Sequence, residues 1–330
     1  MKKNLFFLLL SILVFGQKKL SKIDSIRTEK AAETFIHSFG ENYQNFKIKK
    51  VSDYKATYES ADFCKKTAGL LKINKAFYKA DFDYNGFTDI MIIGTYYDNF
   101  YIIIAMSFGN NNFELKYLTT KYDETCLFPK IIDNNIIRYY YKWYPNRSSN
   151  TNPKLKNKDL IFKYDDFIEY NKDPKLYNIE KIEYQTTACY GSCPVFSITI
   201  DNNRHGIFNA KQSNQMTNDS AELLGVYKTD IDNKSYSEIT DLLNYIDFPN
   251  LNNEYAVSWT DDQTSYLTIT YNNGKVKTIR DYGLIGTHGL DKVYDLLFKL
   301  RFNQKWIADP PKNSTTDSIK KDLNIQRIIR

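Results

Sequence analysis

The first sixteen residues most constrain how this chain can fold, because they indicate the compartment in which it folds. Lys2 and Lys3 form a basic start, and residues 5–15 are apolar apart from one serine. Gly16 then offers the small residue of a cleavage site. This order is typical of a secretory signal peptide over residues 1–16. The alternative is an uncleaved anchor, although the apolar run is shorter than the roughly 20 residues of a membrane span.

Export of the mature chain is the expected consequence of this leader. The first cysteine after it is Cys64, so no cysteine stands where a lipoprotein carries its lipid. We therefore expect a periplasmic or secreted protein without a membrane span after cleavage. The 45 lysines and arginines only slightly outnumber the 39 aspartates and glutamates, and they form no cluster that would indicate a nucleic-acid partner.

Four cysteines in an oxidising compartment favour disulfide bonds. Cys64, Cys126, Cys189 and Cys193 allow three different pairings. Pairing Cys64 with Cys126, and Cys189 with Cys193, keeps each bridge within one half of the chain, and we expect this pairing. A chain of 330 residues can bury a core without such bridges, so they would reinforce the fold locally.

The pattern of apolar residues predicts an α+β fold with two β-rich domains. Few helices are expected: one over residues 24–39, one that starts with a capping box at Ser235 and ends at Pro249, and a last one over residues 289–302. We expect mostly antiparallel sheets with these helices packed on one face. The expected strands lie within residues 76–78, 90–93, 101–104, 113–118, 182–187, 195–200, 206–210, 223–228, 267–271 and 276–279.

The chain is expected to divide into four segments. They are a signal peptide over residues 1–16, a β-rich domain over 17–175, an α+β domain over 176–308 and a polar tail over 309–330. Within the first domain, the polar residues 147–153 and the lysines that follow predict an exposed excursion. Glycine and proline, with 13 and 8 residues, are too few to form long flexible linkers.

Residues 81–89, with the sequence Asp-Phe-Asp-Tyr-Asn-Gly-Phe-Thr-Asp, place oxygen-bearing side chains at a spacing that suits a hard cation such as calcium. Gly86 permits the sharp turn that brings these groups together. The alternative is a metal-free turn in which aspartate and asparagine side chains bond to the nearby backbone. The expected calcium ligands are four side chains and one carbonyl: the side chains of Asp81, Asp83, Asn85 and Asp89, and the carbonyl of Phe87.

These nine residues resemble the calcium-binding, aspartate-rich loop of integrin-type FG-GAP repeats. The glutamate that completes an EF-hand loop at position 12 is missing, since Ile92 stands there, and the flanking patterns predict strands. FG-GAP families build propellers from many repeats, whereas the motif occurs once here. The resemblance therefore implies a structural calcium loop and not a propeller.

Residues 189–194, Cys-Tyr-Gly-Ser-Cys-Pro, predict a tight turn that a disulfide closes. A redox-active dithiol usually has two residues between its cysteines and lies at a helix N-terminus. Here three residues separate Cys189 from Cys193, and a strand is expected to follow. A redox or nucleophilic cysteine and a metal site are the alternatives.

The stretch from Ile179 to Trp306 resembles the domain-of-unknown-function 6438 family of exported bacterial proteins. The resemblance implies a fold unit and an envelope location, but no activity. It is carried by the cysteine turn that leads into Val195-Phe196, the strand over residues 198–200, the segment Asp261-Asp262-Gln263-Thr264 before a hairpin, and Asp281-Tyr282-Gly283 before the last helix.

The loop over residues 283–289 is rich in glycine and lies between an expected strand and an expected helix. Its backbone N–H groups would suit an anion at the helix N-terminus, with His288 beside it. The alternative is a turn in which Thr287 caps the helix. The glycine spacing matches neither a dinucleotide fingerprint nor a P-loop.

Two hypotheses of function remain. The first is an exported, non-catalytic envelope or secreted protein that binds a protein or glycan partner, because the sequence has no motif of a serine hydrolase, a metalloprotease or a nucleotide loop. The aromatic run over residues 139–144 would offer rings to such a partner if the core does not use them. The alternative is an enzyme with a site around Cys193, His205 or His288.

Overall fold

The computed structural model describes residues 21–54, 61–97, 99–119, 126–133, 135–143, 154–216 and 220–309. The expected signal peptide, the polar residues 147–153, the tail beyond Asp309 and Tyr144 of the aromatic run lie outside these residues. Among the described residues, no helix has both the length and the apolar character needed to cross a membrane. The chain divides into two compact units, one up to Lys163 and one from Tyr164.

The first unit is β-rich and contains a five-stranded antiparallel sheet in the order β1-β3-β4-β5, with β2 paired to β3. The central strands β3 and β4 are buried over most of their length, because runs of isoleucine give them apolar side chains on both faces. The strands are β1 (Phe46–Ile48), β2 (Phe77–Ala80), β3 (Asp89–Tyr96), β4 (Asn99–Ser107) and β5 (Phe113–Tyr117).

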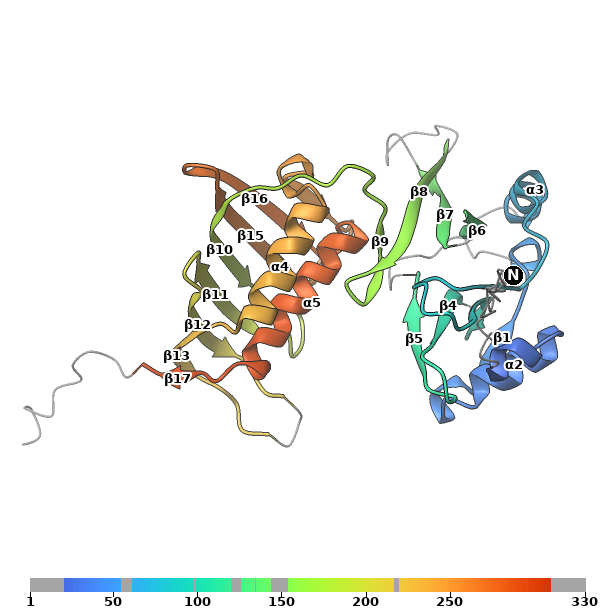
Figure 1. Ribbon diagram of the computed structural model, residues 1–330, viewed down its shortest axis with the longest axis horizontal. Helices are drawn as coiled ribbons and strands as arrows, with labels where there is room; N and C mark the ends of the chain where they lie inside the picture. Colours follow the sequence, from blue (N-terminus) through green and yellow to red (C-terminus); the bar gives the residue numbers. More distant parts are fainter. Residues whose placement is uncertain are drawn as a thin grey trace, which may run out of the picture. The chain divides into compact units, whose positions relative to one another are not determined.

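The helix expected over residues 24–39 is wrong in extent, because two helices share this range. They are α1 (Lys22–Ser25) and α2 (Glu29–His37). Thr28 begins the second helix, since its hydroxyl accepts a hydrogen bond from the N–H of Ala31 at 3.1 Å. Helix α2 lies against β1 (Figure 1). Its Phe35 and Ile36 belong to a core that includes Phe46 of β1.

A third helix, α3 (Ala61–Leu71), was not expected from the sequence. Its buried side includes Cys64, Thr67 and Ala68, which are small and only weakly apolar. Such a face gives little hydrophobic periodicity, which is the main sequence signal of a helix.

The first unit also contains three antiparallel neighbours, β6 (Phe128–Ile132), β7 (Ile136–Trp143) and β8 (Lys154–Lys163). The lysines after residue 153 were expected in an exposed excursion. Lys154 and Lys156 are exposed, but they belong to β8 and not to a loop. Of that strand only Leu160 is fully buried, and Asp159 forms an ion pair with Arg138 of β7 at 2.7 Å. Backbone pairing to β7 thus holds a strand whose side chains are mostly solvated.

The second unit is built on an eight-stranded sheet in the order β14-β16-β15-β10-β11-β12-β13-β17. All pairs are antiparallel except β14 with β16. Strand β9 (Asp166–Glu169) precedes the sheet. The sheet strands are β10 (Ile179–Thr186), β11 (Val195–Asp201), β12 (His205–Gln212), β13 (Gly225–Asp230), β14 (Glu254–Ala256), β15 (Thr264–Tyr271), β16 (Lys275–Tyr282) and β17 (Ile307–Ala308).

Two helices, α4 (Asn233–Tyr245) and α5 (His288–Asn303), lie side by side on one face of this sheet (Figure 1). Aromatic rings join the two layers, since Phe298 of α5 lies edge-on to Phe196 of β11 at 5.1 Å between centroids. The expected capping box at Ser235 is wrong. Asp232 is the N-cap of α4, and its carboxylate accepts from the N–H of Ser235 at 2.9 Å.

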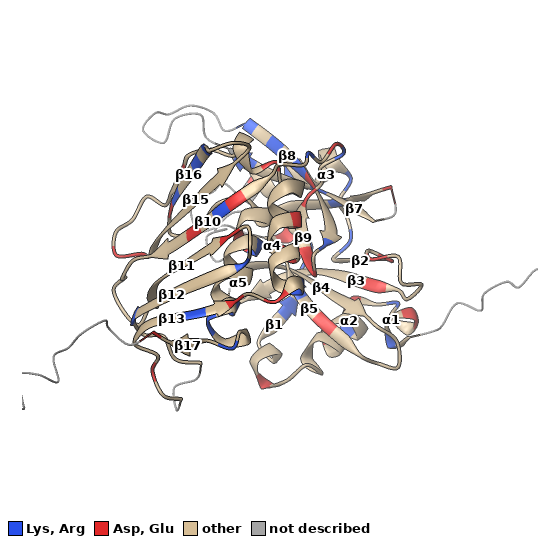
Figure 2. Ribbon diagram, turned by 60° about the vertical axis from the view of Figure 1, so that its left-hand side comes forward, with Lys and Arg blue, Asp and Glu red and all other residues tan. Residues whose placement is uncertain are grey.

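The end of α4 also differs from the expectation, because the helix ends at Tyr245 and Pro249 lies in a separate 3₁₀ turn. The predicted hairpin of β15 and β16 is present. Its turn residues Asn272, Asn273 and Gly274 all have positive φ, the backbone region that asparagine and glycine tolerate best. Acidic and basic residues are interspersed along the described ribbons of both units (Figure 2).

Candidate functional site

The aspartate-rich loop lies between β2 and β3 in the first unit, as expected. The structure brings together three of the predicted ligands: carboxylate oxygens of Asp81, Asp83 and Asp89 lie within 4.8 Å of one another. Asp89 is the first residue of β3 and is fully buried, whereas Asp81 and Asp83 are partly exposed. The oxygen cluster therefore has one rigid, buried member and two members on the loop.

Hydrogen bonds within the loop explain its shape. The Asp81 carboxylate accepts from the N–H of Asn85 at 3.1 Å and from the N–H of Gly86 at 2.9 Å. Tyr84 and Gly86 have φ of 58° and 86°, so the chain reverses through left-handed conformations, which suit glycine at the second position. Phe82, the second residue of the loop, is buried and so fixes the loop to the interior of the unit.

Asp89 joins the loop to the sheet. Its carboxylate accepts from the N–H of Phe82 at 2.8 Å and from the N–H of Ser107, at the end of β4, at 2.7 Å. Burial raises the pKa of Asp89 to about 7, and the charges of Asp83 and Asp81 contribute to this rise. Burial also raises the pKa of Asp83. Burial and mutual repulsion thus disfavour the state in which all three carboxylates are ionised, unless a cation lies among them.

Asn85, the fourth side chain among the expected ligands, forms hydrogen bonds through both ends of its amide. Its side-chain oxygen accepts from the N–H of Phe87 at 2.8 Å, and its amide nitrogen donates to Asp83 at 2.9 Å and to the carbonyl of Ser107 at 2.8 Å. In this structure, Asn85 therefore bonds to the loop backbone, to one of the three carboxylates and to the end of β4. Ser107 was not expected at the site, since it lies 22 residues from Asn85 in sequence and contributes only backbone groups.

Both expected disulfides are present. One joins Cys64 of α3 to Cys126, just before β6, and the other joins Cys189 to Cys193 with 5.6 Å between their Cα atoms. The predicted pairing is thus confirmed. Cys64 and Cys126 are completely buried.

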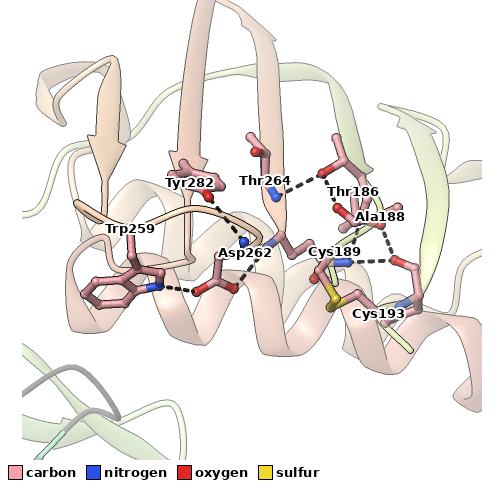
Figure 3. The surroundings of a disulfide bond; sticks show 11 residues. Thr186, Ala188, Cys189, Cys193, Trp259, Asp262, Thr264 and Tyr282 are labelled. Carbon is pink, nitrogen blue, oxygen red and sulfur yellow. Dashed lines mark hydrogen bonds between the residues drawn. A yellow bond between two sulfur atoms is a disulfide. The ribbon is translucent and has the colours of Figure 1, made fainter. Parts of the chain in front are cut away.

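The Cys189–Cys193 turn is held against a second loop, over residues 257–263 (Figure 3). The side-chain amide of Gln263 donates to the carbonyls of Thr187 at 2.9 Å and Pro194 at 2.8 Å, one on each side of the turn. The N–H of Tyr190 donates to the carbonyl of Asp261 at 3.0 Å. These bonds make the turn and the second loop one structural element at this end of the sheet.

Two aromatic side chains lie exposed on this element. Tyr190, at the tip of the turn, is 91% exposed and Trp259 is 44% exposed. The indole N–H of Trp259 donates to the Asp262 carboxylate at 3.2 Å (Figure 3).

Each residue of the enzyme alternative is bonded to another group of the chain in this structure. Cys193 has no free thiol, because its sulfur is bonded to Cys189. His205 lies at the other end of the β11–β12 hairpin from Cys193, roughly 20 Å along a seven-residue strand, and its ring bonds to Asp201 at 3.0 Å. His288 is paired with Glu169, with 3.4 Å between Nδ1 and Oε1.

The glycine-rich loop over residues 283–289 binds acidic groups of the chain itself. The Asp281 carboxylate accepts from the N–H of Ile285 and of Gly286, each at 2.9 Å. The Glu169 carboxylate accepts from the first two N–H groups of α5, also at 2.9 Å. Thr287 caps the helix by accepting from Leu290 at 3.1 Å. The alternative expected from the sequence, an N-cap at Thr287, is therefore the one observed.

Part of the second unit matches a model of a known protein family. Residues 180–301 match the model of a domain of unknown function, DUF6438, and this range runs from β10 into α5. The match confirms the resemblance predicted for the second half of the chain. No match supports the FG-GAP resemblance of residues 81–89, which stays a prediction. No curated protein and no solved structure matches the chain.

Proposed function

We propose that the chain is an exported binding protein, periplasmic or secreted, that performs no catalysis and holds a structural calcium ion in its first unit. The convergence of Asp81, Asp83 and Asp89, with oxygens within 4.8 Å of one another, is the observation that carries this proposal. Three ionised carboxylates at this separation repel one another, and calcium is bound by such clusters of oxygen ligands. Outside the cytoplasm even a roughly millimolar calcium site fills.

Calcium at this position would stabilise the first unit through its three carboxylates. Asp81 and Asp83 belong to the loop, whereas Asp89 belongs to β3 and bonds to the end of β4. A cation bound by all three would therefore fix the loop to the sheet. Asn85 and the carbonyl of Phe87 remain the expected additional ligands.

Two features of the structure support export and binding. The paired cysteines fit an oxidising compartment, because disulfides persist there. The exposed rings of Tyr190 and Trp259 on one reinforced loop element are suited to a protein or glycan partner. The disulfide at Cys193 also removes the nucleophile that the enzyme alternative requires.

Thermal unfolding of the mature chain with and without calcium tests this proposal. At a calcium concentration about ten times the Kd, binding adds about 1.4 kcal/mol to the free energy of unfolding, so the first unit should unfold at a higher temperature than after chelation. Asp83→Asn keeps the size of the side chain and removes one charge, and it should abolish most of the shift.

Asp62→Asn is the matched control, because the Asp62 side chain is 73% exposed on α3. It should retain the full calcium-dependent shift. No shift in the wild-type chain, or the same shift in Asp83→Asn as in the wild type, would contradict the calcium site.

A further inference from the structure

A pocket of about 350 Å³ opens in the first unit at the edge of the face that α2 covers. Four of its lining residues are tyrosines: Tyr43, Tyr96, Tyr101 and Tyr117. Its volume lies within the range of small-molecule sites, which are typically lined by aromatic rings with a few polar groups. Sequence patterns gave no indication of this pocket, because its walls come from four separate segments.

The floor of the pocket depends on Gly94. The Phe46 ring of β1 packs over this glycine, and a methyl group built on Gly94 would lie 2.5 Å from Cζ of Phe46. On the other side of Gly94, its cross-strand partner is Tyr101 of β4. The missing side chain therefore leaves room for the Phe46 ring over the sheet at this position.

The other tyrosines of the lining come from three further elements of the first unit. Tyr96 of β3 is the cross-strand partner of Phe46, and its ring is perpendicular to that of Tyr101 at 6.3 Å between centroids. The 3₁₀ turn η1 (Glu41–Tyr43), which follows α2, supplies Tyr43. The phenol groups of Tyr43 and Tyr117 are joined by a hydrogen bond of 2.7 Å, which fixes both rings.

The lining is aromatic and polar but uncharged. The described lining residues include no lysine, arginine, aspartate or glutamate, and their polar groups are the phenol hydroxyls and the amide of Asn42. A sugar ring presents apolar C–H groups on its faces, which pack on aromatic rings, and hydroxyls at its edge, which bond to phenols and amides. These two sets of groups are both present in the pocket.

We propose that this pocket binds the pyranose ring of a neutral glycan. The inference deepens the proposed function, because it assigns a ligand class to a chain that is proposed to act by binding. A quaternary ammonium ion is the main competitor, since aromatic cages attract cations. Such an ion has no hydrogen-bonding group, so it would make no use of Asn42 or of the phenol hydroxyls.

Calorimetric titration of the mature chain with neutral oligosaccharides tests this proposal. The probes are cellohexaose, maltohexaose and chitohexaose, with tetramethylammonium chloride as the cationic probe. We expect at least one oligosaccharide to bind with a Kd of about 1 mM or lower. Asn42→Ala and Tyr117→Phe each remove a hydrogen-bonding group and should weaken that binding roughly three- to tenfold.

Both substituted side chains are exposed, so the variants should remain folded, and thermal unfolding checks this. Tyr266→Phe in the second unit is the matched control, because it removes an exposed phenol hydroxyl that does not line the pocket, and it should leave the affinity unchanged. The proposal is overturned if no oligosaccharide binds, if binding is the same in Asn42→Ala and Tyr117→Phe as in the wild type, or if tetramethylammonium binds more tightly than every sugar. Calcium-dependent unfolding is measured separately, so it shows whether the calcium site survives such a failure.

Discussion

The two disulfides should stabilise their units by different amounts. In the chain-entropy model, a bridge lowers the entropy of the unfolded chain by an amount that grows with the logarithm of the loop it closes. The Cys64–Cys126 bridge spans 62 residues and the Cys189–Cys193 bridge spans 4. In this model the long bridge stabilises its unit by about 4 kcal/mol at 25 °C, and the short bridge stabilises its unit by about 2 kcal/mol.

Replacing each pair by alanine is the perturbation that tests this difference. Cys64→Ala with Cys126→Ala should lower the free energy of unfolding of the first unit by about 4 kcal/mol and leave the second unit unchanged. Cys189→Ala with Cys193→Ala should lower that of the second unit by about 2 kcal/mol. Peptide-resolved hydrogen exchange in increasing denaturant measures both units in one sample.

A control separates the bridge from the lost side-chain volume. In strong reductant the wild-type chain has no bridges, so the remaining difference between it and each variant is the cost of the smaller side chain. The reasoning is refuted if removal of the four-residue bridge costs as much as removal of the long one. It is also refuted if either loss occurs in the other unit.

Three further predictions concern single residues. Gly94→Ala should destabilise the first unit by about 1–3 kcal/mol in chemical denaturation, because the added methyl group would overlap Phe46, whereas Gly69→Ala, with open space around it, should not. Asp232→Ala removes the N-cap of α4 and should lower the free energy of unfolding of the second unit by about 1 kcal/mol. Hydrogen bonds hold the pKa of Asp232 at about 2, so this contribution is complete above about pH 4 and is lost as the pH falls through 2, as acid titration of both proteins would show. Gln263→Ala should speed hydrogen exchange around the Cys189–Cys193 turn, and unchanged exchange would contradict the role given to its two bonds.

Local sequence patterns predicted the features whose determinants are local. The tight turn at Cys189–Cys193 and the Asn272–Gly274 hairpin each depend on a few consecutive residues. The carboxylates of Asp81 and Asp83 are likewise brought together within one loop. The antiparallel, β-rich architecture followed from short apolar runs separated by turns.

Features that depend on distant residues were missed. The contribution of Ser107 to the aspartate-rich loop requires the pairing of β3 with β4. The tyrosine pocket requires the register that places Phe46 beside Tyr96, which no local pattern specifies. The aromatic run over residues 139–144 was left open between core packing and a partner surface, and Tyr139 is only 2% exposed because its ring packs in the core.

Helix limits show a third kind of difference. Ser235 and Asp232 both have side chains suited to an N-cap, and the sequence pattern favoured the serine because a glutamate follows at the third position. The structure uses Asp232, which also accepts a hydrogen bond from Gln304 at 2.6 Å beyond the end of α5. This bond from a residue distant in sequence favours Asp232 over Ser235 as the N-cap.

Equilibrium dialysis of the mature chain against about 1 mM calcium tests the proposed metal centre most directly. We expect one bound calcium per wild-type chain and none in a variant that carries both Asp81→Asn and Asp83→Asn. A wild-type chain that retains no more calcium than this variant would contradict the structural calcium site, and with it the role assigned to the aspartate-rich loop.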